Sequence, residues 1–203
     1  MKKRVTKTLR NRFEENYVAV SVPANNKRGT KMKYVYYAPW YIWNLPPQEL
    51  KKRKAVILSD NLISLMVFLL SVSLRTPLNN LKPVSLLSAL AFCCHIMEIA
   101  ALVEFIPSKN RSTKIRYEQI NRGLGFFPAL RVVLLTICTI ACAISLPFGY
   151  FSAKALVVTT GNLLCSFLAW AGFKCFRSIP FTTEENDTLS RIGQQRREAE
   201  DDQ

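Results

Sequence analysis

The folding of this chain is limited first by four apolar blocks, at residues 55–74, 84–106, 126–146 and 153–173. Each block is 20 to 23 residues long, and about 20 apolar residues suffice for a helix to cross a bilayer's hydrocarbon core. A segment in lipid must satisfy its own backbone hydrogen bonds, and these blocks lack the alternation typical of barrel strands. The sequence therefore predicts an all-α integral membrane protein, a four-helix bundle of transmembrane helices with short links.

Charged and apolar residues are segregated along the chain. There are 28 Lys and Arg against 14 Asp and Glu, a net charge of +14, and most of that charge lies outside the blocks. A soluble globular domain would disperse its apolar residues at helical or strand spacing, and a disordered basic chain would lack the blocks. We interpret the basic charge as attraction to anionic lipid headgroups, and we expect no nucleic-acid partner.

The number of Lys and Arg alternates from one connecting segment to the next. Residues 1–54 carry 14 of them and residues 107–125 carry five, whereas residues 75–83 carry two and residues 147–152 carry none. Because cytoplasmic loops are enriched in Lys and Arg, we expect both termini and the 107–125 link to be cytoplasmic. We also expect no cleavable signal peptide, with the first block acting as the insertion signal. The short outside links favour a bacterial cytoplasmic membrane.

The segments that flank the membrane domain (residues 55–173) differ in composition. We expect residues 1–33 to be basic and disordered, with Met32 as an alternative start, and residues 174–203 to form a polar, charged cytoplasmic tail. Residues 34–54 form an aromatic and basic segment, which we interpret as an anchor at the membrane surface because Tyr and Trp favour the headgroup level. The alternative is a docking surface for a partner. The aromatic residues of this anchor are Tyr34, Tyr36, Tyr37, Trp40, Tyr41 and Trp43.

A layer of polar residues is predicted inside the bilayer. Ionisable residues within a span are costly and mark functional sites by default. With a helical rise of about 1.5 Å per residue, the residues of this layer lie about 8 to 16 Å from the cytoplasmic ends of their helices. Arg131 can pair with Asp60 or Glu98. The members of the layer are Asp60, His95, Glu98, Arg131 and Asn162.

Small residues recur along one face of the fourth block, at Gly161, Cys165, Ala169 and Gly172. Such stripes let helix backbones approach closely in lipid. Because lipid cannot satisfy polar groups, the polar layer should face the same interior. The spacing therefore predicts a compact bundle with one polar layer inside it.

The sequence carries few signs of enzymatic chemistry. It has a single His, and it contains no H-E-x-x-H, G-x-S-x-G or P-loop motif. We expect no cofactor and no metal site, because Cys93, Cys94 and His95 on one helix cannot close a tetrahedral site. We therefore expect a non-enzymatic accessory or interaction component of a membrane assembly, with a protein partner or a second copy of the chain. The alternative is a small oligomeric ion- or proton-coupled transporter that uses the polar layer.

Overall fold

The computed structural model describes residues 15–23 and 30–188, and its internal contacts divide the chain into two units. The helical unit comprises residues 43–110 and 118–180. The strand unit comprises residues up to 42, residues 111–117 and residues from 181 onward. The two units are described separately.

The described chain is mostly helical, and four helical segments are long and apolar enough to cross a membrane. They are Pro47–Ser73, Lys82–Phe105, Lys114–Phe148 and Ala153–Arg177. The first, second and fourth are the helices α2, α3 and α6, and the third combines α4 (Lys114–Gly125), α5 (Phe127–Ser145) and the short helix η2 (Leu146–Phe148). A further short helix, η1 (Pro77–Asn80), links α2 to α3. The four predicted apolar helices are confirmed.

Two of the helices extend beyond the apolar blocks. Helix α2 begins at Pro47 rather than at residue 55, and α6 continues to Arg177 rather than ending at residue 173. Proline is favoured in the first helical turn, where its fixed φ fits and its missing N–H has no intrahelical partner to lose. The basic run that was expected to lie along the membrane surface, Lys51 to Lys54, is therefore helical.

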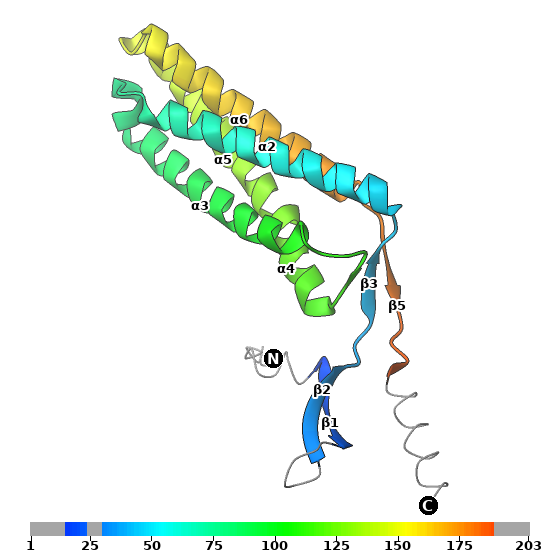
Figure 1. Cartoon of the computed structure of the whole chain (residues 1–203). Helices are drawn as coiled ribbons and strands as arrows, with labels where there is room; N and C mark the ends of the chain where they lie inside the picture. The colour runs from blue at the N-terminus through cyan, green and yellow to red at the C-terminus, as the bar shows by residue number, and fades with distance from the viewer. Residues whose placement is uncertain (1–14, 24–29, 189–203) are drawn as a thin grey trace, which may run out of the picture. The chain divides into compact units, whose positions relative to one another are not determined.

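The four long helices lie side by side (Figure 1), with α6 packed against α2 and α5, and with α5 packed against α3. The small stripe of α6 faces α2. A Cβ atom at Gly161 would stand 2.1 Å from Ser71 Oγ, so any other residue at this position would require the serine to turn away or the helices to separate. One turn further along, Cys165 Sγ lies 3.3 Å from the carbonyl oxygen of Ser64. The stripe thus brings the two backbones together, as small residues do in membrane helices.

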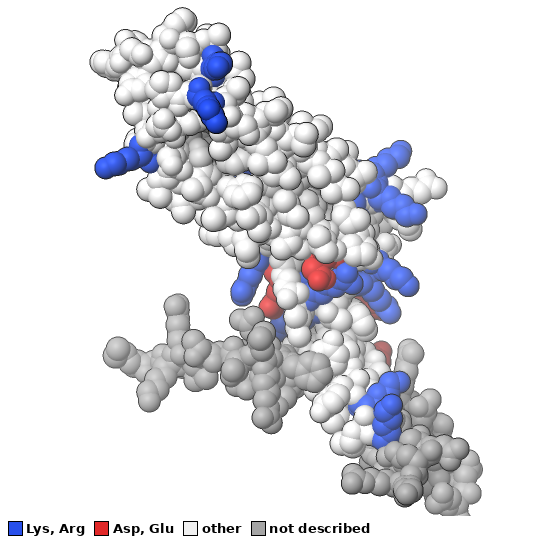
Figure 2. Space-filling model, turned by 60° about the vertical axis from the view of Figure 1, so that its left-hand side comes forward, with Lys and Arg blue, Asp and Glu red and all other residues white. Residues whose placement is uncertain are grey.

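Side-chain hydrogen bonds join the helix termini at one end of the helical unit. Lys54 of α2 donates to the carbonyl oxygens of Ile106 and Ser108, just beyond α3. Arg53 donates to Ser178 Oγ beyond α6, and Arg177 donates to the carbonyl oxygen of Gly125 before α5. Figure 2 shows the middle of the helical unit free of Lys, Arg, Asp and Glu on the visible face, with Lys and Arg toward its ends. This is the charge distribution expected of helices that cross a membrane.

Among its described residues, the strand unit contains two small sheets. In the first, β1 (Tyr17–Pro23) pairs antiparallel with β2 (Thr30–Tyr36). In the second, β3 (Trp40–Trp43) lies between β4 (Arg111–Ser112) and β5 (Phe181–Glu184), in the order β4-β3-β5. The second sheet therefore joins segments that are far apart in the sequence.

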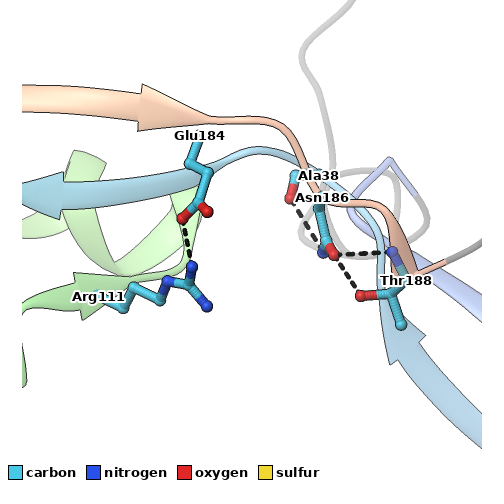
Figure 3. Close-up of polar contacts among 5 residues, drawn as sticks. All are labelled: Ala38, Arg111, Glu184, Asn186 and Thr188. Atoms are coloured by element: carbon cyan, nitrogen blue, oxygen red, sulfur yellow. Dashed lines mark hydrogen bonds and ion pairs between the residues drawn. The ribbon is translucent and has the colours of Figure 1, made fainter.

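Within the strand unit, Glu184 and Asn186 hold the C-terminal segment against the other strands (Figure 3). Arg111 of β4 forms an ion pair with Glu184 of β5. Asn186 donates from Nδ2 to the carbonyl oxygens of Tyr36, at 2.8 Å, and Ala38, at 3.4 Å, while its Oδ1 accepts from the backbone N–H of Thr188 at 3.2 Å. These contacts give residues 181–188 a defined place in the strand unit, whereas the sequence predicted only a polar, charged tail.

The expectation of disorder at the N-terminus also differs from the structure. Residues 17–23 and 30–33, which we expected to be disordered, form most of a β-hairpin. Alternating Val18 and Val20 in β1 favour a strand, but the high charge of the surrounding segment hides this short pattern. The same expectation for residues 1–14, 24–29 and 189–203 lies outside the described residues.

Candidate functional site

A buried polar cluster lies inside the helical unit, at residues from α2, α3 and α5. Arg131 Nη2 of α5 lies 3.0 Å from Glu98 Oε2 of α3, and Asn61 Nδ2 of α2 donates to the same oxygen at 3.0 Å. His95 Nε2 lies 3.1 Å from Asn61 Oδ1. All four residues are buried, with Asn61 at 6% exposure the most accessible. We call these four residues the polar cluster.

The hydrogen bonds of the polar cluster have a single consistent direction. Glu98 as a carboxylate only accepts, so Asn61 must present its Nδ2 group to Glu98 and its Oδ1 to His95. The amide oxygen in turn only accepts, so the proton of this hydrogen bond resides on His95 Nε2. The histidine therefore orients the asparagine, the asparagine orients the carboxylate, and the carboxylate neutralises Arg131. This arrangement can hold three helices in one register.

Three of the five residues predicted for the layer are in the polar cluster: His95, Glu98 and Arg131. Asp60 is not part of the cluster. It precedes Asn61 on α2, so its side chain points in a different direction and is only partly buried. Among the described residues it makes no hydrogen bond or ion pair. Asn162 of α6 is buried at 2% exposure, but its amide points toward Cys138 Sγ at 3.6 Å. Of the two possible partners of Arg131, the structure selects Glu98.

The sequence analysis missed Asn61, which connects His95 to Glu98. The buried residues of α2 follow a spacing of four and three residues that includes Ile57, Asn61, Ser64, Phe68 and Ser71. The charge of Asp60 made it the predicted residue of this helix, but its position is about 100° around the helix axis from that of Asn61. The signal that would have found Asn61 is its shared spacing with the two serines, since all three polar residues belong to one helix face.

A small cavity adjoins the polar cluster. It has a volume of about 10 Å³, room for about one water molecule, and Asp60, Asn61, Glu98 and Arg131 contribute to its lining. Within the described part of the chain, Glu98 Oε1 and the Nε and Nη1 atoms of Arg131 have no hydrogen-bond partner. The pair thus keeps hydrogen-bonding capacity beyond the contacts that hold the helices.

The six aromatic residues predicted as a membrane-surface anchor are divided between the two units. Trp43 is buried in the helical unit, with its ring edge-to-face on Phe105 (centroids 5.5 Å apart) and on Phe176 (6.2 Å). The other five, Tyr34, Tyr36, Tyr37, Trp40 and Tyr41, belong to the strand unit.

Within the strand unit, the aromatic rings stack on one another. Tyr41 stacks on Tyr117 with ring centroids 4.3 Å apart, and Tyr36 contacts Trp40 at 4.7 Å. Tyr34 is 61% exposed, whereas Tyr36 is buried. The anchor role of the whole segment stays a prediction, with Tyr34 the member best placed to meet an external surface.

Tyr36 also organises its surroundings through its hydroxyl group. The hydroxyl donates to the carbonyl oxygen of Pro39 at 2.7 Å and accepts from the backbone N–H of Lys114 at 2.9 Å. Burial raises the pKa of Tyr36 above its ordinary value, and the Lys114 hydrogen bond opposes this rise. A neutral Tyr36 therefore joins β2, the following turn and the start of α4.

Metal-binding geometry is not found in the described part of the chain, where no three His, Cys, Asp or Glu side chains are placed to hold one ion. Comparisons with protein-family models, with curated proteins and with solved structures find no match to the chain. The argument for a function therefore depends on the geometry of the two units.

Proposed function

We propose that the chain is a non-enzymatic accessory or interaction component of a membrane assembly. In this proposal α2, α3, α5 and α6 form a membrane-spanning bundle, both termini face the cytoplasm, and the membrane is a bacterial cytoplasmic membrane. The strand unit then lies on the cytoplasmic side and is the part available to a protein partner or to a second copy. The polar cluster holds the bundle together.

The observation that carries the proposal is that buried contacts of the polar cluster link α2, α3 and α5. Glu98 and Arg131 pair at 3.0 Å, with side-chain exposures of 2% and 3%, and Asn61 and His95 supply the next contacts. Breaking such a buried pair is costly, so the pair favours one arrangement of α3 and α5. The adjoining cavity of about 10 Å³ is far smaller than the 300–1,000 Å³ typical of ligand pockets. This geometry favours a structural role over a catalytic one.

The outer surface of the helices supports the membrane part of the proposal. Large apolar side chains are exposed along α2 at Leu62, Ile63, Met66 and Leu70, and each is more than half exposed. Patches of this extent mark contact with lipid or with a partner. In a bilayer such side chains face hydrocarbon or other helices.

The strand unit supports the interaction part of the proposal. All four residues of β5 are exposed, and β5 is the edge of its sheet. An unpaired sheet edge can accept a further strand. The hairpin of β1 and β2 is a two-stranded sheet, and such hairpins have marginal stability in isolation. Both features fit a surface that a partner completes.

The test is purification of the tagged full chain from its membrane in mild detergent, followed by size-exclusion chromatography and mass spectrometry. The proposal expects one partner in fixed stoichiometry that is lost when β5 is altered by Thr182→Pro and Thr183→Pro, because proline cannot donate to a neighbouring strand. The control is Lys82→Gln, at an exposed residue at the start of α3, which should retain the partner. Recovery of the chain by itself under all conditions would contradict the proposal.

A second candidate function, proton-coupled transport, is favoured by one specific observation. The unpaired Glu98 Oε1 and the unpaired nitrogens of Arg131 lie beside a cavity that Asp60 also lines, and Asp60 is partly exposed. A proton could pass from Asp60 through one water molecule to Glu98. A chain of this size would have to form an oligomer to enclose a path.

This candidate is tested by proton flux into vesicles that contain the purified chain. Transport by this route requires flux that Glu98→Gln abolishes and Glu104→Gln retains, since Glu104 is an exposed acidic residue of the same helix. No flux above that of empty vesicles would eliminate the transport candidate and leave the accessory role.

A further inference from the structure

A pocket lies at the end of the helical unit where α2 begins and α3 ends. Its volume is about 500 Å³, and its walls come from the first turns of α2 and from the segment after α3. Pro47 and Leu50 form the α2 wall, and Ile106 and Pro107 form the α3 wall. The pocket therefore has an apolar lining at a position where a spanning helix leaves the hydrocarbon.

Three lysines surround this apolar lining: Lys51, Lys54 and Lys109. Lys51 and Lys109 are exposed, and no described acidic side chain forms an ion pair with either of them. The nearest acid on α2 is Glu49, which lies 3.6 Å from Arg53. Two exposed ammonium groups thus remain at the rim of an apolar pocket.

Lys54 is buried and builds the wall of the pocket. Its Nζ donates to Ser108 O at 2.5 Å, to Ser108 Oγ at 3.0 Å and to Ile106 O at 3.3 Å, and it lies over the Phe105 ring at 4.9 Å. The C-terminal carbonyl groups of α3 would otherwise repel an anion. By donating to carbonyl groups at this helix end, Lys54 offsets that repulsion and fixes the segment that carries Lys109.

The start of α2 adds a weaker contribution of the same sign. No side chain caps the first turn of α2, and its N-terminus lies at Pro47 in the wall of the pocket. The N-terminal end of a helix carries a partial positive charge. The helix end and the three lysines therefore favour the same kind of ligand.

We propose that this pocket binds one anionic phospholipid, with the headgroup phosphate between Lys51 and Lys109 and the glycerol and upper acyl carbons against the apolar walls. The apolar lining distinguishes a phospholipid from a free phosphate, which would gain nothing from Leu50 or Pro107. The inference rests on the membrane insertion proposed above, and it adds a specific lipid site to the general attraction of a basic protein for anionic lipid.

The experiment uses the purified full chain in detergent micelles with added phosphatidylglycerol or phosphatidylcholine, and native mass spectrometry counts the lipids bound to each chain. We expect one phosphatidylglycerol to be retained in preference to phosphatidylcholine. The Lys51→Gln/Lys109→Gln variant should bind phosphatidylglycerol about tenfold or more weakly, since each lysine near an anionic surface adds measurable attraction. Circular dichroism checks that the variant stays helical, and Lys109→Gln alone provides a milder second variant.

The matched control is Lys82→Gln/Lys154→Gln, which removes two exposed lysines from the opposite helix ends. Equal loss of lipid in this control would overturn the site, because it would show general charge attraction only. Competition by inorganic phosphate at equal concentration would also overturn it. Flotation of the chain with phosphatidylcholine vesicles separates the two proposals: failure to float contradicts membrane insertion, whereas flotation without phosphatidylglycerol selectivity contradicts only the lipid site.

Discussion

Two Arg–Glu ion pairs, Arg131–Glu98 in the helical unit and Arg111–Glu184 in the strand unit, differ in burial. The side chains of Arg131 and Glu98 in the helical unit are 3% and 2% exposed, whereas those of Arg111 and Glu184 in the strand unit are 56% and 47% exposed. Loss of one partner from a buried pair costs about 3–5 kcal/mol, whereas an exposed pair is worth about 0–1 kcal/mol. The same two types of side chain can therefore determine how helices pack in one unit and contribute little to the stability of a sheet in the other.

The largest effect is expected from Arg131→Leu. The substitution leaves Glu98 buried in a low-dielectric interior without its cation, and this should lower the free energy of unfolding by about 3–5 kcal/mol. Equilibrium unfolding of the purified chain in mixed detergent micelles, followed by circular dichroism, measures the loss. A decrease below about 1 kcal/mol would place the buried pair in the same class as the exposed one.

A smaller effect is expected from the contact between α2 and α6. Gly161→Ala places a Cβ atom 2.1 Å from Ser71 Oγ, so the helices must separate or the serine must turn away. Overpacking of this kind costs about 1–3 kcal/mol. In Gly172→Ala the nearest atom, Asp60 Cβ, would be 4.0 Å away, and the stability should stay close to that of the unchanged chain. Equal destabilisation by both substitutions, in the same unfolding assay, would argue against the observed helix packing.

The two units also differ in how far the sequence predicts them. The apolar blocks predict the four long helices because the signal is local and spans about 20 residues at a time. Within the polar cluster, charge alone identifies Glu98 and Arg131 but selects Asp60 where the structure uses Asn61. The identity of an inward residue depends on helix rotation, and a rotation error of about 100° corresponds to one position in the sequence.

The strand unit was harder to predict because its pairing is not local. Tyr41 pairs with Ser112 and Ile42 with Arg111, about 70 residues further along the sequence, and no short sequence pattern predicts such distant partners. Strands of two and four residues also lack the length at which alternation becomes a signal. The aromatic residues of this unit suggested a membrane surface, and their stacking on Tyr117 and Phe181 became visible only in three dimensions.

A third and smaller effect is expected in the strand unit, from the hydrogen bonds of the Tyr36 hydroxyl group. Tyr36→Phe removes the hydrogen bonds to Pro39 and Lys114 and should destabilise this unit by about 1–2 kcal/mol. Because burial raises the pKa of Tyr36, the stability it contributes is present below its ordinary value near 10 and is lost as the pH rises beyond that value.

Hydrogen exchange of β2 and of the start of α4 measures both effects. Exchange in the unchanged chain should accelerate at alkaline pH, and the Tyr36→Phe variant should lack the part of this acceleration that comes from Tyr36. Identical alkaline acceleration in the variant would show that other groups cause it. The Tyr34→Phe variant is the control, since Tyr34 is exposed.

The smallest effect is expected from the exposed pair. Arg111→Gln removes the ion pair with Glu184 and should change the stability of the strand unit by about 1 kcal/mol or less. Salt should reduce even this difference, because exposed charges are screened. Hydrogen exchange at β5, measured at low and high salt, tests the expectation. A salt-independent loss of about 3 kcal/mol would mean that this pair resembles the buried one.

The central claim, that Glu98 and Arg131 form one structural unit inside the bundle, is tested most directly by a double-mutant cycle. Unfolding free energies in mixed micelles are compared for Glu98→Leu, Arg131→Leu and the double variant. The account predicts that each single substitution costs about 3–5 kcal/mol and that the double variant costs less than either, because no unpaired charge is left buried. Costs of the two single substitutions that simply add in the double variant would contradict it.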